Sequence, residues 1–143
     1  MTTKKYLSQV LEIETTIKLL SAEIEHRRAM AQSISAVISD SDRVQSSGSY
    51  DKMADKIAII IDKEEELKNT IIYHDQKRDE IVKELNQLEN TTYFNVLFGK
   101  YISGLSLYEI GEYMNRKQRQ MVNIHGYALL AFEKKFGKKY KNI

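Results

Sequence analysis

The chain has 143 residues, of which 42% are apolar and 29% are charged, a composition typical of a folded protein and too apolar for a disordered one. Cysteine is absent, which excludes disulfides, Cys-ligated zinc, iron–sulfur clusters and thiol catalysis. Proline is also absent, which disfavours a loop-rich β-sandwich or barrel. The longest purely apolar run, residues 57–61, is too short to span a membrane, and the N-terminus lacks the apolar core of a signal peptide. We therefore expect a cytoplasmic protein with no membrane association.

The net charge of +2 is unevenly distributed along the chain. Residues 1–90 hold 13 Lys/Arg and 17 Asp/Glu, a net charge of −4, whereas residues 91–143 hold 9 and 3, a net charge of +6. This asymmetry predicts two domains, 1–90 and 91–143, with different roles. The basic domain is expected to attract a polyanion, and a basic surface without a partner is the alternative.

Residues 1–90 predict two long helices joined by one loop. Apolar residues recur at alternating steps of three and four, which is typical of the seam of a coiled coil. The first seam contains Val10, Ile13, Ile17, Leu20, Ile24, Ala31, Ile34 and Ile38, with Arg27 as its one polar member. The second contains Met53, Ile57, Ile60, Leu67, Ile71, Ile81, Leu85 and Leu88, with Glu64, His74 and Arg78 as polar members. Residues 39–50, rich in Ser, Asp and Gly, form the expected loop, so the fold class is all-α with an antiparallel coiled-coil hairpin.

Polar residues within the seams suggest a register for this hairpin. Facing residues of an antiparallel pair have a constant sum of residue numbers, and a sum of 91 places Arg27 opposite Glu64 and Ile24 opposite Leu67. A polar pair within an apolar seam is a known way of fixing register. In the alternative, Arg27 extends along the surface and Glu64 lies in water.

Nine further apolar residues of the hairpin lie outside the seams and indicate a second contact surface. Either the hairpin self-associates or the C-terminal part docks on it. Because these residues occur along the full length of both helices, we expect a homodimer or higher homo-oligomer. They are Leu7, Leu11, Leu19, Met30, Val37, Ile59, Ile61, Ile72 and Tyr73.

Residues 91–143 predict a C-terminal three-helix domain that contains a helix-turn-helix. The expected helices cover about residues 92–102, 107–114 and 117–136. Ser106 and Glu109 have the spacing of a capping box, and Asn115 suits the left-handed corner of a turn. The inward residues of the last helix are expected to be Met121, Ile124, Ala128, Leu129 and Phe132. A small helical bundle with a polar exposed face is the alternative.

The outward face of the last helix has the side chains that a recognition helix uses in the major groove of DNA. Arg119 can donate twice to guanine, Asn123 and the glutamines can bridge adenine, and Val122 can contact a thymine methyl group. The candidate base-contacting residues are Gln118, Arg119, Gln120, Val122 and Asn123. The candidate phosphate-contacting residues are Lys100, Arg116, Lys117, Lys134, Lys135, Lys138, Lys139 and Lys141.

The inventory of reactive residues does not favour an enzyme. The three histidines, His26, His74 and His125, lack the spacing of known metal sites, and there is no glycine-rich phosphate loop. His74 is expected to be structural, and His125 either packs or contacts phosphate. We therefore expect no catalytic residues, no metal and no cofactor.

Residues 106–132 resemble region 4 of sigma-70-type factors through Ser106, Leu107, Glu109 and Ile110, followed by Met121, Ile124, Ala128 and Leu129. The similarity extends to a family of small phage-encoded transcriptional regulators of the ArpU and RinA kind. It is carried by the loop string of residues 44–55, by Arg119-Gln120 and by His125-Gly126. The resemblance implies a phage or prophage origin and sequence-specific binding of double-stranded DNA in the bacterial host cell. RNA polymerase is a possible partner of the hairpin or its loop.

Two departures from the sigma pattern stand in the last helix. Lys117 occupies the N-cap position, where Ser or Thr is usual, at a cost of roughly 1 kcal/mol in helix stability. Val122 stands where sigma factors often have Arg. Two other functions stay open: a DNA-packaging protein like a small terminase subunit, which would form a ring, and a protein-interaction module that does not bind DNA.

Overall fold

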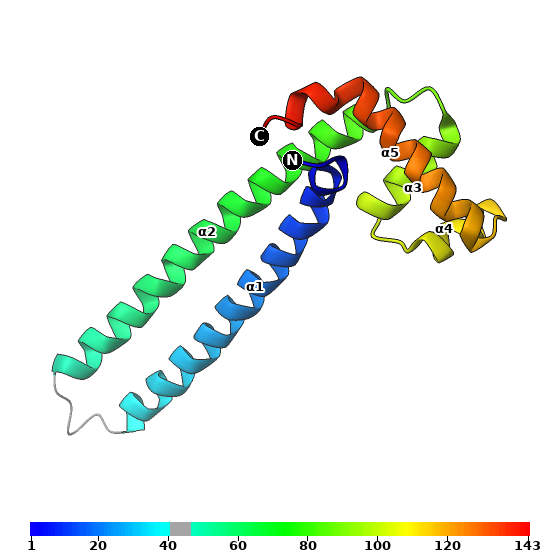
Figure 1. The fold of residues 1–143 in the computed structure, drawn as a ribbon. Helices are drawn as coiled ribbons and strands as arrows, with labels where there is room; N and C mark the ends of the chain where they lie inside the picture. The colour runs from blue at the N-terminus through cyan, green and yellow to red at the C-terminus, as the bar shows by residue number, and fades with distance from the viewer. Residues whose placement is uncertain (41–46) are drawn as a thin grey trace. The chain divides into compact units, whose positions relative to one another are not determined.

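The computed structural model describes residues 1–40 and 47–143, with side chains described for residues 1–37 and 50–143. Its elements are the helices α1 (Thr3–Asp40), α2 (Ser47–Leu85), α3 (Thr91–Tyr101), α4 (Leu107–Met114) and α5 (Gln118–Tyr140) (Figure 1). The all-α prediction is confirmed. The predicted loop over residues 39–50 is too long at both ends, because α1 continues to Asp40 and α2 begins at Ser47. Residues 41–46, which include the first part of the 44–55 string, lie outside the described residues.

The chain divides into two compact units, and the division does not fall at residue 90. One unit is Thr15–Tyr73, and the other combines Met1–Glu14 with His74–Ile143. The base of the hairpin therefore belongs with the three C-terminal helices and not with the rest of the hairpin. Charge and periodicity predicted a boundary where the hairpin ends, but neither signal reports packing between distant parts of a chain.

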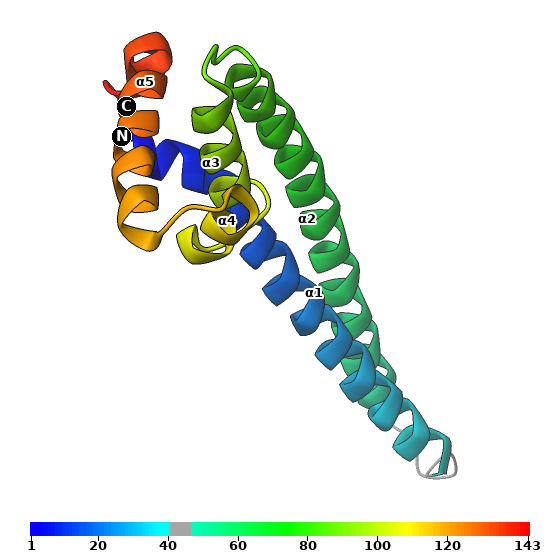
Figure 2. The same ribbon diagram turned by 90° about the vertical axis from the view of Figure 1, so that its right-hand side faces the viewer.

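In the unit Thr15–Tyr73, α1 and α2 run antiparallel (Figure 2). The centre of the predicted seam is buried, with exposed fractions of 2% for Ile24 and 8% for both Ala31 and Ile60. Ile57 and Ile71, also predicted in the seam, remain exposed. A two-helix core is thin, so burial is complete only near the line where the helices meet.

The predicted Arg27–Glu64 pair is wrong. Arg28 Nη2 lies 2.6 Å from Glu64 Oε1, whereas Arg27 Nε bonds to Glu23 Oε1 at 2.7 Å within α1. The Arg27 guanidinium is satisfied one turn away, and the neighbouring arginine reaches across to α2. Residue numbers 28 and 64 sum to 92, one more than the predicted 91, so the observed pair agrees with the register to within one residue.

The unit Met1–Glu14 with His74–Ile143 has a core built from four helices. Buried side chains come from α1, α2, α3 and α5, and they include Leu7, Ile81, Leu97 and Phe132, each 0% exposed. Leu7 is one of the apolar residues outside the predicted seam. Docking of the C-terminal part therefore covers the base of the hairpin, and the remaining exposed apolar residues of the hairpin belong to the other unit.

Polar and aromatic contacts join the start of α1, the end of α2 and the end of α5. Tyr6 donates its hydroxyl proton to Glu84 Oε1 at 2.5 Å, and the rings of Tyr6 and Tyr140 stack with centroids 4.4 Å apart. The hydroxyls of Thr3 and Tyr140 lie 2.8 Å apart. These contacts explain why α5 continues to Tyr140, one turn beyond the predicted end near residue 136.

The hairpin register predicts a selective cross-link. Cysteines at Ile24 and Leu67 should form an intrachain disulfide in high yield, because facing seam positions bring Cβ atoms close to disulfide range. Mass spectrometry under non-reducing conditions measures the yield. The control pair at Ile24 and Ile60 is displaced by one heptad and should stay reduced, so efficient linking of this pair and none of the first would contradict the register.

Candidate nucleic-acid interface

The helices α4 and α5 form a tight corner around a small core. Val96, Ile110 and Met121 form its buried centre. Gly111 lies where α4 meets the turn, and a Cβ atom there would stand 2.8 Å from the backbone oxygen of Arg116 and 3.0 Å from Met121 Cγ. Only glycine permits this approach, so the packing fixes the direction in which α5 leaves the turn.

The caps of α4 form as the sequence predicts. Ser106 Oγ accepts from the Glu109 backbone N–H at 3.1 Å, and Glu109 Oε1 accepts from the Ser106 backbone N–H at 3.4 Å. At the other end Asn115 has φ 56°, in the left-handed region that asparagine tolerates. Arg116 N–H then donates to Gly111 O at 2.8 Å, which closes the turn. The predicted capping box and asparagine turn are confirmed.

The start of α5 has only one of the two hydrogen bonds of a capping box. Lys117 stands at the N-cap, and its ammonium group has no lone pair to accept the free N–H groups of the first turn. Gln120 contributes the reciprocal contact, since its Oε1 accepts from the Lys117 backbone N–H at 3.2 Å. Among the candidate base-contacting residues, Gln120 thus has an intrachain bond that it must exchange or share to contact a base.

The first turns of α5 separate an inward side from an outward side, as predicted. Met121 is 0% exposed within the small core, whereas Gln118, Arg119 and Asn123 are exposed and Val122 is 52% exposed. Arg119 makes no ion pair in the part of the chain that the structure describes. Its five guanidinium N–H groups are therefore available for an external acceptor.

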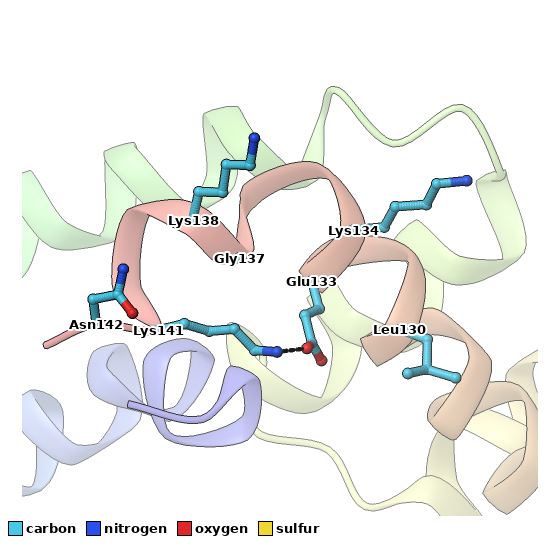
Figure 3. A pocket seen from close by; sticks show the side chains of 7 residues that line it. All are labelled: Leu130, Glu133, Lys134, Gly137, Lys138, Lys141 and Asn142. Carbon is cyan, nitrogen blue, oxygen red and sulfur yellow. Dashed lines mark ion pairs between the residues drawn. The ribbon is translucent and has the colours of Figure 1, made fainter.

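Three candidate phosphate-contacting lysines have partners within the chain. The Lys139 ammonium pairs with the carboxylates of Glu80 and Glu84, and Lys135 Nζ donates to Gln87 O at 2.5 Å. Lys141 pairs with Glu133, and Figure 3 shows this contact as a dashed line. Lys139 in particular contributes to the base of the hairpin, which the sequence analysis did not predict.

The remaining candidates are free or nearly so. Lys134 and Lys138 extend from α5 beside a shallow hollow at its C-terminal end, and no described residue forms an ion pair with them (Figure 3). Arg116 and Lys117 are exposed at the turn before α5. Lys100 is half-buried, with Nζ 6.0 Å from the centroid of the Tyr101 ring. Free cations therefore lie at both ends of α5.

Exposed tyrosines join this surface, and the sequence analysis missed them. Tyr108 and Tyr113 on α4 are 64% and 82% exposed. Tyr108 also lines a groove with Arg116 and Lys117 beside the first residue of α5. The available signal was their position, because Ile110 and Gly111 face inward on α4 and leave both tyrosines outward. A phenol can donate a hydrogen bond to a phosphate oxygen.

His125 packs within the protein and does not face outward. It is 7% exposed, and its Nε2 shares a hydrogen bond of 2.8 Å with the Tyr101 hydroxyl. Burial, with the charges of Lys100 and Lys4 nearby, lowers the pKa of His125 to about 4. Burial also raises the pKa of Tyr101 to about 12, so both partners of this hydrogen bond are neutral at pH 7. Of the two roles predicted for His125, packing is confirmed and phosphate contact is wrong.

Two features are absent from the described residues. No group of three or more His, Asp or Glu side chains among them is arranged to hold a metal ion. None of the helices, over the residues described, is both long and apolar enough to cross a bilayer.

No protein-family model, no curated protein and no solved structure matches this chain. The resemblance to sigma region 4 and to phage regulators therefore stays an expectation from the sequence. The geometry of α4, α5 and the turn between them is therefore the structural basis for a proposed function.

The buried His125 predicts acid sensitivity. The pKa is about 6.5 in the unfolded chain and about 4 in the folded one, so the unfolded state binds the proton first as the pH falls. The contribution of His125 to stability is complete above pH 6.5 and is lost progressively down to pH 4, about 2 kcal/mol of it by pH 5. Urea unfolding at pH 7.5 and pH 5 measures the loss. His125→Gln, which can still share a hydrogen bond with Tyr101, should lose less than the wild type, and an equal loss would contradict the assignment.

Proposed function

We propose that this protein binds double-stranded DNA sequence-specifically through α4 and α5 and thereby regulates transcription. One observation carries the proposal: Gln118, Arg119 and Asn123 are exposed on the first turns of α5, while Met121 on the same turns is fully buried. Hydrogen-bonding groups are thus held on a rigid element in a fixed direction. The resemblance to phage transcriptional regulators supports the same class of function.

In the proposed complex, the start of α5 enters the major groove and α4 lies across the backbone. The Arg119 guanidinium donates two hydrogen bonds to O6 and N7 of a guanine, and the Asn123 amide bridges N6 and N7 of an adenine. Val122 contributes an apolar contact, which suits a thymine methyl group. These contacts read sequence, because each base pair shows a different donor and acceptor pattern in that groove.

Contacts to phosphates would position the helix without reading bases. Arg116 and Lys117 lie before α5, and Lys134 and Lys138 lie near its end, so they can neutralise phosphates on both sides of the groove. The net charge of +6 on residues 91–143 adds a long-range attraction that falls as salt rises.

The proposed role of the hairpin is self-association, with contact to RNA polymerase as the alternative. A single helix-turn-helix contacts few base pairs, and dimers gain specificity by binding two half-sites. Large apolar side chains are exposed in the unit Thr15–Tyr73. They include Leu19, Met30, Ile59, Ile61 and Ile72.

Selection from a random duplex library, followed by titration of the enriched duplex, tests DNA binding. Arg119→Ala should weaken binding to that duplex by about 1–3 kcal/mol and relax the preference at one base position. Lys134→Ala is the matched control for charge. It should weaken binding to selected and random duplexes about equally and reduce the salt slope by about one unit.

If the protein enriches no duplex from the library, the proposal fails and a protein-interaction module becomes the better interpretation. If it binds DNA but Arg119→Ala changes neither affinity nor base preference, α5 is not the recognition helix. A large ring of subunits would instead favour the DNA-packaging alternative over a regulator.

Self-association through the hairpin predicts a dimer or higher oligomer at micromolar concentration. Ile61→Glu and Ile72→Glu should each dissociate it, because burying an unpaired charge in an apolar interface is costly. The matched control is Asn95→Glu, which adds the same charge at an exposed polar position of α3, outside the unit Thr15–Tyr73. Light scattering measures the mass, and a wild-type monomer of 16.6 kDa would contradict self-association.

A further inference from the structure

The exposed side of α5 contains a glycine that nothing in the described chain requires. Gly126 is exposed, and a Cβ atom built on it would have no heavy atom within 4 Å. The glycines of the corner differ, because a Cβ atom would come within 3.0 Å of Ile110 at Gly99 and within 2.8 Å of Arg116 O at Gly111. Glycine inside a helix lowers stability relative to alanine. The fold therefore gains nothing from the missing side chain at Gly126.

Gly126 lies in line with the candidate base-contacting residues. It follows Val122 by four residues and Asn123 by three, spacings that place all three on one side of an α-helix. Leu130, four residues further on, is 63% exposed, and the adjacent Tyr127 is 61% exposed. Gly126 thus forms a gap in the side-chain layer along the side of α5 that the proposed complex presents to DNA.

Charge favours DNA as the occupant of this gap. The helix α5 contains one arginine and four lysines but a single carboxylate, Glu133, which pairs with Lys141. Arg119 and Lys134, which form no ion pair among the described residues, lie within about 80° of Gly126 around the helix axis. Such a side attracts a polyanion, whereas a helix of another protein would require acidic residues to balance it.

We propose that Gly126 is a positioning residue that lets the backbone of α5 lie deep in the major groove. This inference rests on the proposed DNA binding. The distance between donor and acceptor in a hydrogen bond to a base edge can vary by only about 0.5 Å before the bond is lost. A methyl group at residue 126 would hold the helix further out than this and would withdraw Arg119 and Asn123 from the bases together.

The test is Gly126→Ala in the full chain, with the duplex enriched by the wild type and a random duplex as probes. Affinity for the enriched duplex should fall by about tenfold or more, while affinity for the random duplex, held by phosphate contacts, changes little. The thermal unfolding midpoint should rise by about 2–4 °C, because alanine is the better helix former. Weaker binding by a more stable protein is an effect that a general folding defect cannot produce.

Asn95→Ala is the matched control, since Asn95 is exposed within α3, outside the helix-turn-helix. It should raise the midpoint by a similar amount and leave both affinities unchanged. The inference is overturned if Gly126→Ala binds the enriched duplex as tightly as the wild type, or loses affinity equally for both duplexes. It is also overturned if Gly126→Ala lowers the midpoint, which would show a packing role within the chain. Failure of the wild type to enrich any duplex would instead remove the proposed function itself.

Discussion

The candidate interface depends on one constraint: the single helix α5 belongs to two hydrophobic cores. Met121, near its start, packs in the small core with Val96 and Ile110. Phe132 and Tyr140, further along, pack in the core that includes the base of the hairpin. Two anchors on one helix of 23 residues leave it little freedom to rotate. The outward side of α5 therefore has a defined direction before any partner binds, which lowers the cost of ordering side chains on binding.

The same constraint determines which cations of α5 are available. Lys135 and Lys139 lie on the side that faces the base of the hairpin, and both bond to groups of that region. Lys134 and Lys138 project from the exposed side and have no ion-pair partner among the described residues (Figure 3). Lysines adjacent in sequence thus have different roles. A count of charges along the sequence does not reveal this difference, because it does not tell towards which side of the helix each lysine projects.

The elements that local chemistry dictates could be predicted from the sequence. The bounds of α4 follow from the Ser106 cap at one end and the Asn115 corner at the other, and both signals lie within a few residues of the effect. The inward position of Met121 and the outward position of Asn123 follow from helical periodicity in the same way.

Contacts between distant residues could not be predicted in this way. Arg28 and not Arg27 pairs with Glu64, because Arg27 bonds to Glu23 within α1 while Arg28 reaches across to α2. The burial of Leu7 depends on helices that begin more than eighty residues later in the chain. Periodicity identifies an apolar side of a helix, but it does not identify what covers that side.

The two sides of α5 contribute differently to the stability of the fold. The N-cap residue Lys117 cannot accept the first N–H groups of the helix, and Gly126 lies in its interior. Each of these residues lowers the intrinsic helix propensity of α5. Burial of Met121, Phe132 and Tyr140 compensates, since packing of an apolar side stabilises most helices in proteins. The outward side of α5 therefore contributes little to the stability of the fold. Its residues can be suited to contacts with a partner at little cost to the two cores.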